Sequence, residues 1–199
     1  MEMVHNDETG KKLGMWLFLY TEIILFGGLF VLYAVYLTVH TQDFIDGGKQ
    51  LSRIFGLINT VILLISSFAV AASITAVQKE QKGLALTGLG VTLGCGLIFL
   101  INKYFEWGAK ISLGIYPNSE TLMDGPTGQN VFFGLYYVIT GLHGLHIVIG
   151  MTVLAVAMAY VASGKVTSTR FALLENAGLY WHLVDLIWIF IFPLFYLII

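Results

Sequence analysis

Residues 54–77 read IFGLINTVILLISSFAVAASITAV, a run that is long, apolar and free of charged residues. An α-helix needs about 20 mostly apolar residues to cross the hydrocarbon core of a lipid bilayer. A run of this length and composition is therefore typical of a transmembrane helix. The fold class then depends on how often the chain repeats the pattern.

The pattern occurs four more times. The other apolar runs cover residues 13–39, 84–102, 131–161 and 171–199. All ten Lys and Arg residues fall outside the five runs, and only three acidic residues lie inside them. We therefore predict an all-α fold: a polytopic membrane protein that forms a bundle of five transmembrane helices within a single domain, residues 1–199. Residues 103–130 form the longest predicted connection outside the membrane.

The overall composition excludes several classes of protein. The 199 residues are 57% hydrophobic and only 11% charged, whereas soluble domains carry about 25% charged residues. A soluble enzyme, a disordered tail and a nucleic-acid-binding domain are therefore excluded. The net charge of −2 gives no attraction toward nucleic acid. Because Cys95 is the only cysteine, the chain has neither an internal disulfide nor a cysteine zinc site.

The loop cations predict the orientation, because cytoplasmic loops carry an excess of Lys and Arg. With a cytoplasmic N-terminus, the cytoplasmic side holds six cations and the other side holds four. The six are Lys11, Lys12, Lys79, Lys82, Lys165 and Arg170, and the four are Lys49, Arg53, Lys103 and Lys110. We therefore expect a cytoplasmic N-terminus and a periplasmic C-terminus.

One charge cluster follows the third predicted span. Lys103 and Glu106 are three residues apart, and Glu106 and Lys110 are four residues apart. These spacings bring side chains together on a helix, so the charges can pair if the helix extends beyond residue 102. We predict an interface charge cluster here.

Glu22 lies well inside the first span, among apolar neighbours. Ionisable groups inside a membrane are costly and are candidates for function. One interpretation is a group that holds a proton or makes a regulatory contact. The other is a protonated carboxyl that hydrogen-bonds to a neighbouring helix.

Polar residues also cluster in the fourth and fifth spans. His143 and His146 are three residues apart, as are His182 and Asp185. Three interpretations compete: haem ligation, a proton relay, and an interhelix polar lock in which the groups satisfy each other. A two-haem protein needs four axial positions, whereas the spans contain three histidines. The sequence contains no recognisable self-contained active site.

Several motifs resemble one known family. Residues 14–26 read GMWLFLYTEIILF, residues 141–146 read GLHGLH, and residues 180–188 read YWHLVDLIW. Lys103, Glu106 and Trp107 form a further motif, and Glu175 precedes the last one. Together they resemble subunit III of the haem–copper terminal oxidases, which use cytochrome c or quinol, in its five-helix bacterial form.

The resemblance implies a non-catalytic integral subunit of an oxidoreductase complex, with no active site, catalytic residue or metal of its own. Haem and copper are then expected in the catalytic subunit I, beside which this chain packs with the other oxidase subunits. It would sustain aerobic electron transport and coupled proton uptake in the bacterial plasma membrane, and hold structural phospholipid.

The resemblance also implies roles for individual residues. Glu22 falls on the family's carbodiimide-reactive glutamate, which implies an effect on proton uptake. The polar-lock interpretation agrees with a supporting subunit, and its members are His143, His146, His182, Asp185 and Glu175. Two alternatives remain: an accessory subunit of a nitric-oxide reductase, and an independent proton-coupled transporter. Transporters usually contain repeats and broken helices, whereas Pro193 is the only proline inside a span.

Overall fold

The computed structural model describes residues 8–197, and this part of the chain is helical with no strand beyond one isolated bridge. Five helices are long and apolar enough to cross a membrane, which confirms the predicted class. They are α1 (Glu8–Val39), α3 (Arg53–Gln78), α4 (Lys82–Ser112), α6 (Thr127–Ala162) and α7 (Ala172–Phe192). A π-helical turn, η1 (Pro193–Leu197), follows α7. Residues 198–199 of the last predicted span lie outside the described residues.

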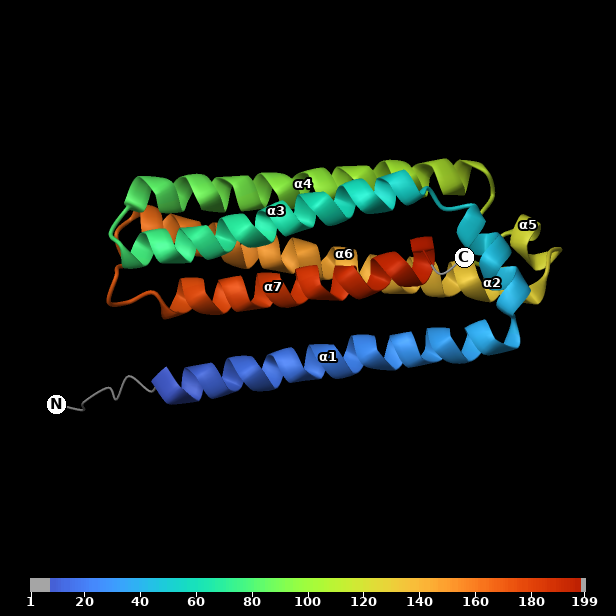
Figure 1. Ribbon diagram of the computed structural model, residues 1–199, viewed down its shortest axis with the longest axis horizontal. Helices are drawn as coiled ribbons and strands as arrows, with labels where there is room; N and C mark the ends of the chain where they lie inside the picture. Colours follow the sequence, from blue (N-terminus) through green and yellow to red (C-terminus); the bar gives the residue numbers. More distant parts are fainter. Residues whose placement is uncertain (1–7, 198–199) are drawn as a thin grey trace.

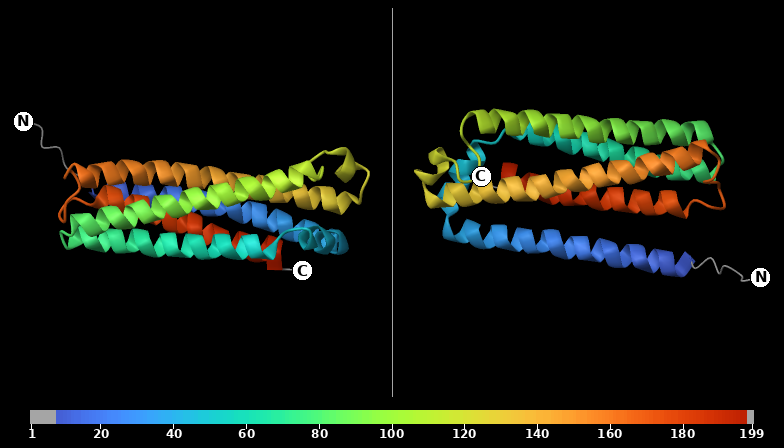
Figure 2. Two further views of the ribbon diagram at one scale, coloured as in Figure 1. Left: turned by 90° about the horizontal axis from the view of Figure 1, so that it is seen from above. Right: turned by 180° about the vertical axis from the view of Figure 1, so that it is seen from behind.

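The five long helices lie side by side as an elongated bundle (Figure 1). α3 and α4 form a hairpin along one side, α6 and α7 occupy the middle, and α1 runs along the opposite side. The view from behind gives the same order (Figure 2). The α3–α4 turn and the α6–α7 connection lie at the end where α1 begins, and η1 ends toward the opposite end.

The third long helix extends well past its predicted end. α4 ends at Ser112 rather than at residue 102, so much of the predicted connection 103–130 is helical. The physical reason is that Lys103 and Glu106 neutralise each other inside the bundle instead of ending the helix at water. The remaining connection carries only the short helix α5 (Glu120–Met123).

A short helix outside the five predicted spans joins α1 to α3. This helix, α2 (Thr41–Lys49), lies across the end of the bundle (Figure 1). Phe44 is buried on its inner side, and an Asp43 carboxylate oxygen accepts a hydrogen bond from the Gly128 backbone N–H over 3.2 Å. The first N–H groups of a helix lack intrahelical partners, so Asp43 satisfies one of them at the start of α6.

Small residues allow the close packing of α3 against α4. A Cβ atom added to Gly88 would overlap the Ser73 hydroxyl and would lie 2.9 Å from the Ala69 carbonyl oxygen. Inside a membrane the hydrophobic effect does not drive helices together, so their association depends on close packing. Small residues allow that close approach. This approach holds the α3–α4 hairpin together as a unit.

In contrast, α1 lies at the periphery. Only 11% of the most apolar stretch of α1 is buried, compared with 50% of the corresponding stretch in the last span, Ala172–Leu197. Trp16 and Tyr20 are each 62% exposed on its outer face. α1 therefore packs against the bundle along one face only, through the buried side chains of Leu19, Phe26 and Tyr33.

Candidate functional site

Glu22 on α1 lies directly opposite His146 on α6. Its carboxylate Oε2 is 2.8 Å from Nε2 of His146, and the two side chains are 14% and 9% exposed. The two residues are 124 positions apart in the sequence. This contact places the intramembrane acid predicted from the sequence against a histidine of the GLHGLH motif.

The second ring nitrogen of His146 determines the hydrogen-bonding pattern. Nδ1 lies 2.7 Å from the Leu142 carbonyl oxygen, one turn back along α6. A carbonyl oxygen only accepts hydrogen bonds, so Nδ1 carries a proton and donates it. Nε2 is therefore left to share a proton with Glu22. In an overall neutral pair this proton resides either on the carboxyl group or on the imidazole.

Aromatic rings enclose the pair. The His146 ring packs edge-on against Phe26 of α1, with centroids 5.2 Å apart, and is stacked with Tyr180 of α7 at 6.5 Å. The Tyr180 hydroxyl donates to the His146 carbonyl oxygen over 3.4 Å. The Glu22–His146 pair thus lies where α1, α6 and α7 meet.

His143 has a different environment, although it is only one turn away. It is completely buried, and its ring packs against Phe99 at 5.5 Å and Trp188 at 5.3 Å. Neither of its ring nitrogens has a hydrogen-bond partner among residues 8–197. His143 therefore faces α4 and α7, whereas His146 faces α1.

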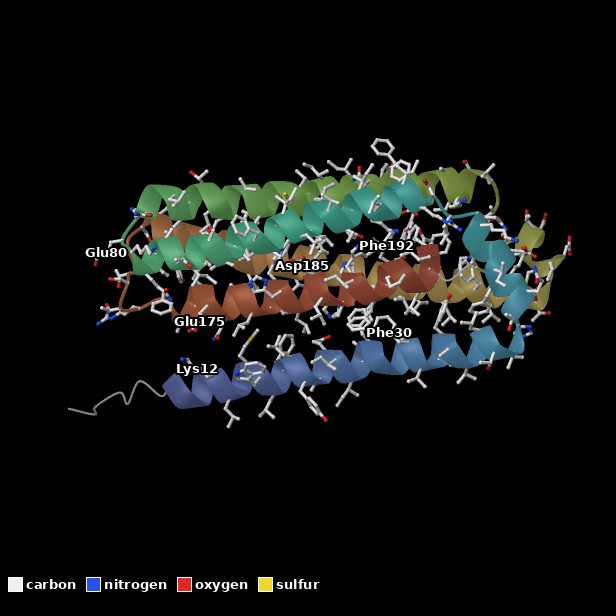
Figure 3. All side chains as sticks on the ribbon, in the orientation of Figure 1. Lys12, Phe30, Glu80, Glu175, Asp185 and Phe192 are labelled. Atoms are coloured by element: carbon white, nitrogen blue, oxygen red, sulfur yellow. The ribbon has the colours of Figure 1, made fainter. Side chains whose placement is uncertain are left out.

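The polar residues of α7 contact α3 and α1. His182 Nδ1 lies 2.7 Å from the Ser67 hydroxyl of α3. Asp185 lies between α7 and α3 (Figure 3), and neither of its carboxylate oxygens is hydrogen-bonded in the described part of the chain. Glu175 lies 4.0 Å from the Lys12 ammonium, near the start of α1.

The five residues assigned to the polar lock therefore do not form one hydrogen-bonded group. His146 joins α6 to α1, His182 joins α7 to α3, and Glu175 of α7 approaches Lys12 of α1. No hydrogen bond joins any of these three to another within residues 8–197. Whether the set acts as a lock stays a prediction.

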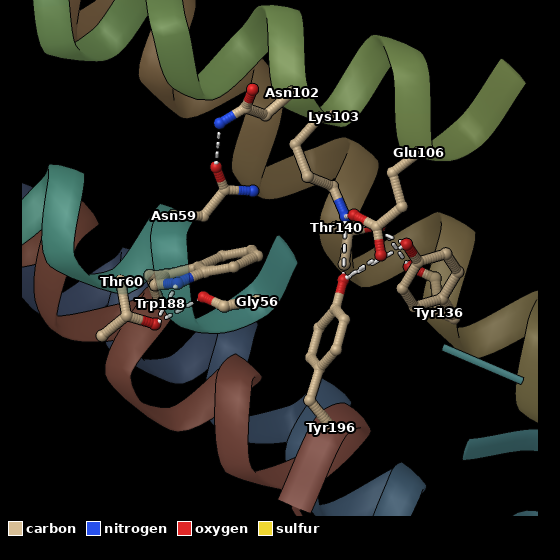
Figure 4. Close-up of polar contacts among 10 residues, drawn as sticks. All are labelled: Gly56, Asn59, Thr60, Asn102, Lys103, Glu106, Tyr136, Thr140, Trp188 and Tyr196. Carbon is tan, nitrogen blue, oxygen red and sulfur yellow. Dashed lines mark hydrogen bonds and ion pairs between the residues drawn. The ribbon is translucent and has the colours of Figure 1, made fainter. Parts of the chain in front are cut away.

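Lys103 and Glu106 form a second polar site, deep between α4, α6 and η1 (Figure 4). The Lys103 ammonium donates to Glu106 Oε2 over 2.8 Å, and to the hydroxyls of Tyr136 and Tyr196 over 3.0 and 3.2 Å. The Tyr196 hydroxyl donates to Glu106 Oε1 over 2.7 Å. Both charged side chains are more than nine-tenths buried.

These hydrogen bonds and the ion pair offset the free-energy cost of burying the two charges. The Lys103 ammonium also lies 4.9 Å from the centre of the Tyr136 ring, within the range of a cation–π interaction. The spacing of Lys103 and Glu106 predicted their pairing, but nothing in the local sequence identified Tyr136 and Tyr196, 33 and 93 residues from Lys103. Lys110 points elsewhere and donates to the Gln50 carbonyl oxygen.

Neither polar site has the composition of a metal centre. No group of three or more His, Cys, Asp and Glu side chains within the described residues is placed to hold a metal ion. The sites instead join helices: Glu22–His146 joins α1 to α6, and the Lys103 cluster joins α4 to α6 and η1.

Comparison with known proteins identifies the family. Residues 3–198 match the family described as Cytochrome c oxidase subunit III. The chain is 30% identical to Cytochrome bo(3) ubiquinol oxidase subunit 3 of Pseudomonas aeruginosa, over 97% of this chain and 87% of that relative. It is also 30% identical to Cytochrome c oxidase subunit 3 of Synechocystis, over 98% and 78% of the two chains. A third relative is the Heme-copper oxidase subunit I+III of Aeropyrum pernix, 29% identical over 92% of this chain and 22% of that protein. The chain belongs to the cytochrome c oxidase subunit III family.

Proposed function

We propose that this chain is the subunit III of a haem–copper terminal oxidase, and that it supports a catalytic subunit I rather than carrying a redox centre itself. The family match over residues 3–198 supports this role and favours it over a nitric-oxide reductase accessory protein or an independent transporter. Subunit I is proposed as the partner because one relative carries both subunit names in a single protein.

The Glu22–His146 contact is the observation that carries the proposed effect on proton uptake. Because Leu142 fixes the proton on Nδ1, a single proton is shared across the 2.8 Å between Nε2 and the carboxylate. The proton can change sides without creating net charge in the membrane, which avoids the cost of an isolated charge. The pair can thus hold one proton at the edge of the bundle and exchange it with a neighbouring group.

We further propose that the chain crosses a bacterial plasma membrane with its N-terminus in the cytoplasm and its C-terminus in the periplasm. The α3–α4 and α6–α7 connections, together with the first residue of α4, carry four cations against the single acid Glu80: Lys79, Lys82, Lys165 and Arg170. An excess of cations on one side supports a cytoplasmic location for that side. We also propose that the complex holds structural phospholipid, and that the polar residues of the last two spans act as an interhelix lock.

Purification of the intact complex tests the main assignment. The tagged chain is isolated from its native membrane in mild detergent, the other subunits are identified by mass spectrometry, and a reduced-minus-oxidised spectrum is recorded. We expect a haem–copper subunit and its haem bands. A monodisperse chain without that partner would contradict the assignment. Recovery of a nitric-oxide reductase, or solute-dependent proton flux by the chain alone in liposomes, would favour one of the alternatives.

The role of the Glu22–His146 pair has its own test. Glu22→Gln keeps a hydrogen bond to Nε2 but removes the acidic proton. We expect slower proton uptake per turnover by the complex in vesicles, with unchanged haem spectra and subunit content. Glu120→Gln, which alters an exposed acid of α5 outside both polar sites, serves as the matched control. Equal proton uptake by the wild type and Glu22→Gln would contradict the role.

A further inference from the structure

The Tyr196 hydroxyl has a proton acceptor as its hydrogen-bond partner. It donates to the Glu106 carboxylate over 2.7 Å, and both side chains are buried (Figure 4). The hydroxyls of Tyr33, Tyr137 and Tyr180 donate instead to backbone carbonyl oxygens. A carboxylate can take up a whole proton, whereas a backbone carbonyl oxygen does not hold one at neutral pH. Tyr196 can therefore lose its proton inside the bundle, without contact with water.

A series of aromatic rings leads from Tyr196 to the surface of the bundle. The hydroxyls of Tyr196 and Tyr136 are 3.3 Å apart. The ring centre of Tyr136 lies 5.4 Å from that of Tyr137, which lies 5.0 Å from that of Trp107. We call these four side chains the aromatic path. Its outer end, Trp107, is partly exposed and lines a surface hollow of about 610 Å³ on α4.

The aromatic path joins side chains that can lose one electron. Tyrosine and tryptophan are the aromatic side chains most easily oxidised, and rings in contact pass an electron on quickly. A phenol that has lost an electron is a strong acid. It gives up its proton when an acceptor lies within hydrogen-bond reach, about 2.6–3.2 Å. Glu106 lies within that reach of Tyr196.

The Lys103 ammonium decides which tyrosine keeps the oxidised state. It donates to the hydroxyls of both Tyr136 and Tyr196, so a positive charge on either ring is unfavourable. Tyr196 avoids this cost, because transfer of its proton to Glu106 leaves a neutral radical. The positive charge that remains resides on Lys103. Its ammonium lies 4.9, 5.6 and 5.9 Å from the ring centres of Tyr136, Trp188 and Tyr196, which stabilise a cation.

We propose that Tyr196 is a redox-active tyrosine that supplies one electron, through the aromatic path, to an oxidant at Trp107. The oxidant is a lipid peroxyl radical, which forms when oxygen attacks membrane lipid. The surface beside Trp107 favours a lipid-soluble oxidant over an ionic one, because Tyr104 and Phe105 are 76% and 63% exposed there. The proposal goes beyond the supporting role in an oxidase and does not depend on it, because every residue involved belongs to this chain.

The reaction balances as follows. The peroxyl radical gains one electron and takes one proton from water, which gives the lipid hydroperoxide. Tyr196 loses that electron, its O–H bond breaks, and the proton passes to Glu106. The products on the chain are a neutral tyrosyl radical and a neutral carboxyl group. A membrane hydroquinone can then give one electron, release a proton and become a semiquinone, while the Glu106 proton returns to the phenol.

Electron paramagnetic resonance of the purified full-length chain tests the proposal. The chain, in liposomes of saturated phospholipid, receives a lipid-soluble azo initiator that generates peroxyl radicals, and samples are frozen over time. We expect a neutral tyrosyl signal that persists after the radicals of exposed tyrosines have decayed. Tyr196→Phe should abolish it, whereas Tyr104→Phe, which alters an exposed tyrosine, should retain it. Absence of the persistent signal in the wild type, or an equal signal in Tyr196→Phe, would overturn the proposal.

The double variant Lys103→Met with Glu106→Gln separates proton transfer from structure. Its amide oxygen still accepts a hydrogen bond from Tyr196 but does not take up the proton, and no unpaired charge is left in the interior. We expect a folded protein, as judged by circular dichroism and thermal unfolding, that gives no persistent tyrosyl signal. A signal equal to that of the wild type in this variant would overturn the role of Glu106 as the proton acceptor.

Two further measurements test the path and the oxidant. Trp107→Phe keeps an aromatic ring but makes it harder to oxidise, so the tyrosyl signal should rise more slowly. Trp16→Phe alters a tryptophan that is 62% exposed on α1, outside the path, and should leave the rate unchanged. Equal rates for the two variants would overturn the aromatic path. A persistent signal with photo-oxidised tris(bipyridine)ruthenium but none with peroxyl radicals would overturn the assigned oxidant.

Discussion

The Tyr196 hydroxyl donates a hydrogen bond to Glu106 Oε1 over 2.7 Å and thereby joins η1 to α4. The last carbonyl groups of a helix lack intrahelical partners, and the neighbouring Leu194 carbonyl oxygen accepts from the Tyr33 hydroxyl of α1 over 2.5 Å. The π-helical turn is therefore held from two sides.

Removal of the Tyr196 hydroxyl should destabilise the bundle. In Tyr196→Phe, Glu106 Oε1 loses its donor while it stays buried, which costs about 1–3 kcal/mol. The melting temperature of the detergent-solubilised protein should fall. Tyr104→Phe removes a hydroxyl from a side chain that is 76% exposed, and should leave the melting temperature unchanged. Equal melting temperatures for both variants would contradict the importance of this hydrogen bond.

Lys103 should be needed only while Glu106 is charged. Lys103→Met leaves a buried carboxylate without its ion-pair partner, and breaking such a pair costs about 3–5 kcal/mol. Adding Glu106→Gln should restore most of the loss, because a neutral amide oxygen still accepts from Tyr196. Denaturant unfolding of the single and double variants measures the difference. A double variant no more stable than Lys103→Met would show that the paired charges are not the source of the effect.

Two neighbouring glycines of α4 should respond in opposite ways to alanine. Gly88→Ala places a methyl group against Ser73 and Ala69, and overpacking of this kind costs about 1–3 kcal/mol. Gly90 has no heavy atom within 4 Å of the same position, and alanine is the better helix former. Gly90→Ala should therefore be neutral or slightly stabilising. Thermal unfolding of both variants tests this, and equal losses would argue against close packing of α3 on α4.

Glu22 should react with a hydrophobic carbodiimide near neutral pH. The reagent requires a protonated carboxyl group, and the geometry allows Glu22 to hold the proton it shares with His146. Glu175 lies 4.0 Å from the Lys12 ammonium and is 37% exposed, so it should remain unmodified. Peptide mass spectrometry locates the adduct, which Glu22→Gln should abolish. Modification of Glu175 alone would refute the predicted environment of Glu22.

The sequence predicted the number and approximate positions of the membrane helices because hydropathy is a local property. The same reasoning placed the end of α4 at residue 102, because Lys103 and Glu106 look like the start of a polar connection. Their burial depends on Tyr136 and Tyr196, which come from distant parts of the chain. Hydropathy does not register the hydrogen bonds by which distant side chains allow a local ion pair to be buried.

The candidate site could be predicted as a set of residues but not as a set of contacts. Glu22 and His146 were both singled out as intramembrane polar groups, but their partnership depends on how α1 packs against α6. His143 and His146 are three residues apart, a spacing that predicts positions near one face of a helix. In the structure His143 packs between Phe99 and Trp188 instead. Helical spacing predicts roughly toward which side of a helix a side chain points. Its contacts depend on how the neighbouring helices pack.

The attachment of α1 also has a consequence for biosynthesis. Glu22 and Tyr33 find their partners 124 and 161 residues later in the chain. At roughly 5–20 residues per second of synthesis, Glu22 waits about 6–25 s before His146 has even been made. During that interval the acid has no partner on α6, and a buried acid is costly in lipid. α1 is thus synthesised well before it is anchored, and a chain truncated before α6 would leave Glu22 without its partner for quality-control proteases to recognise.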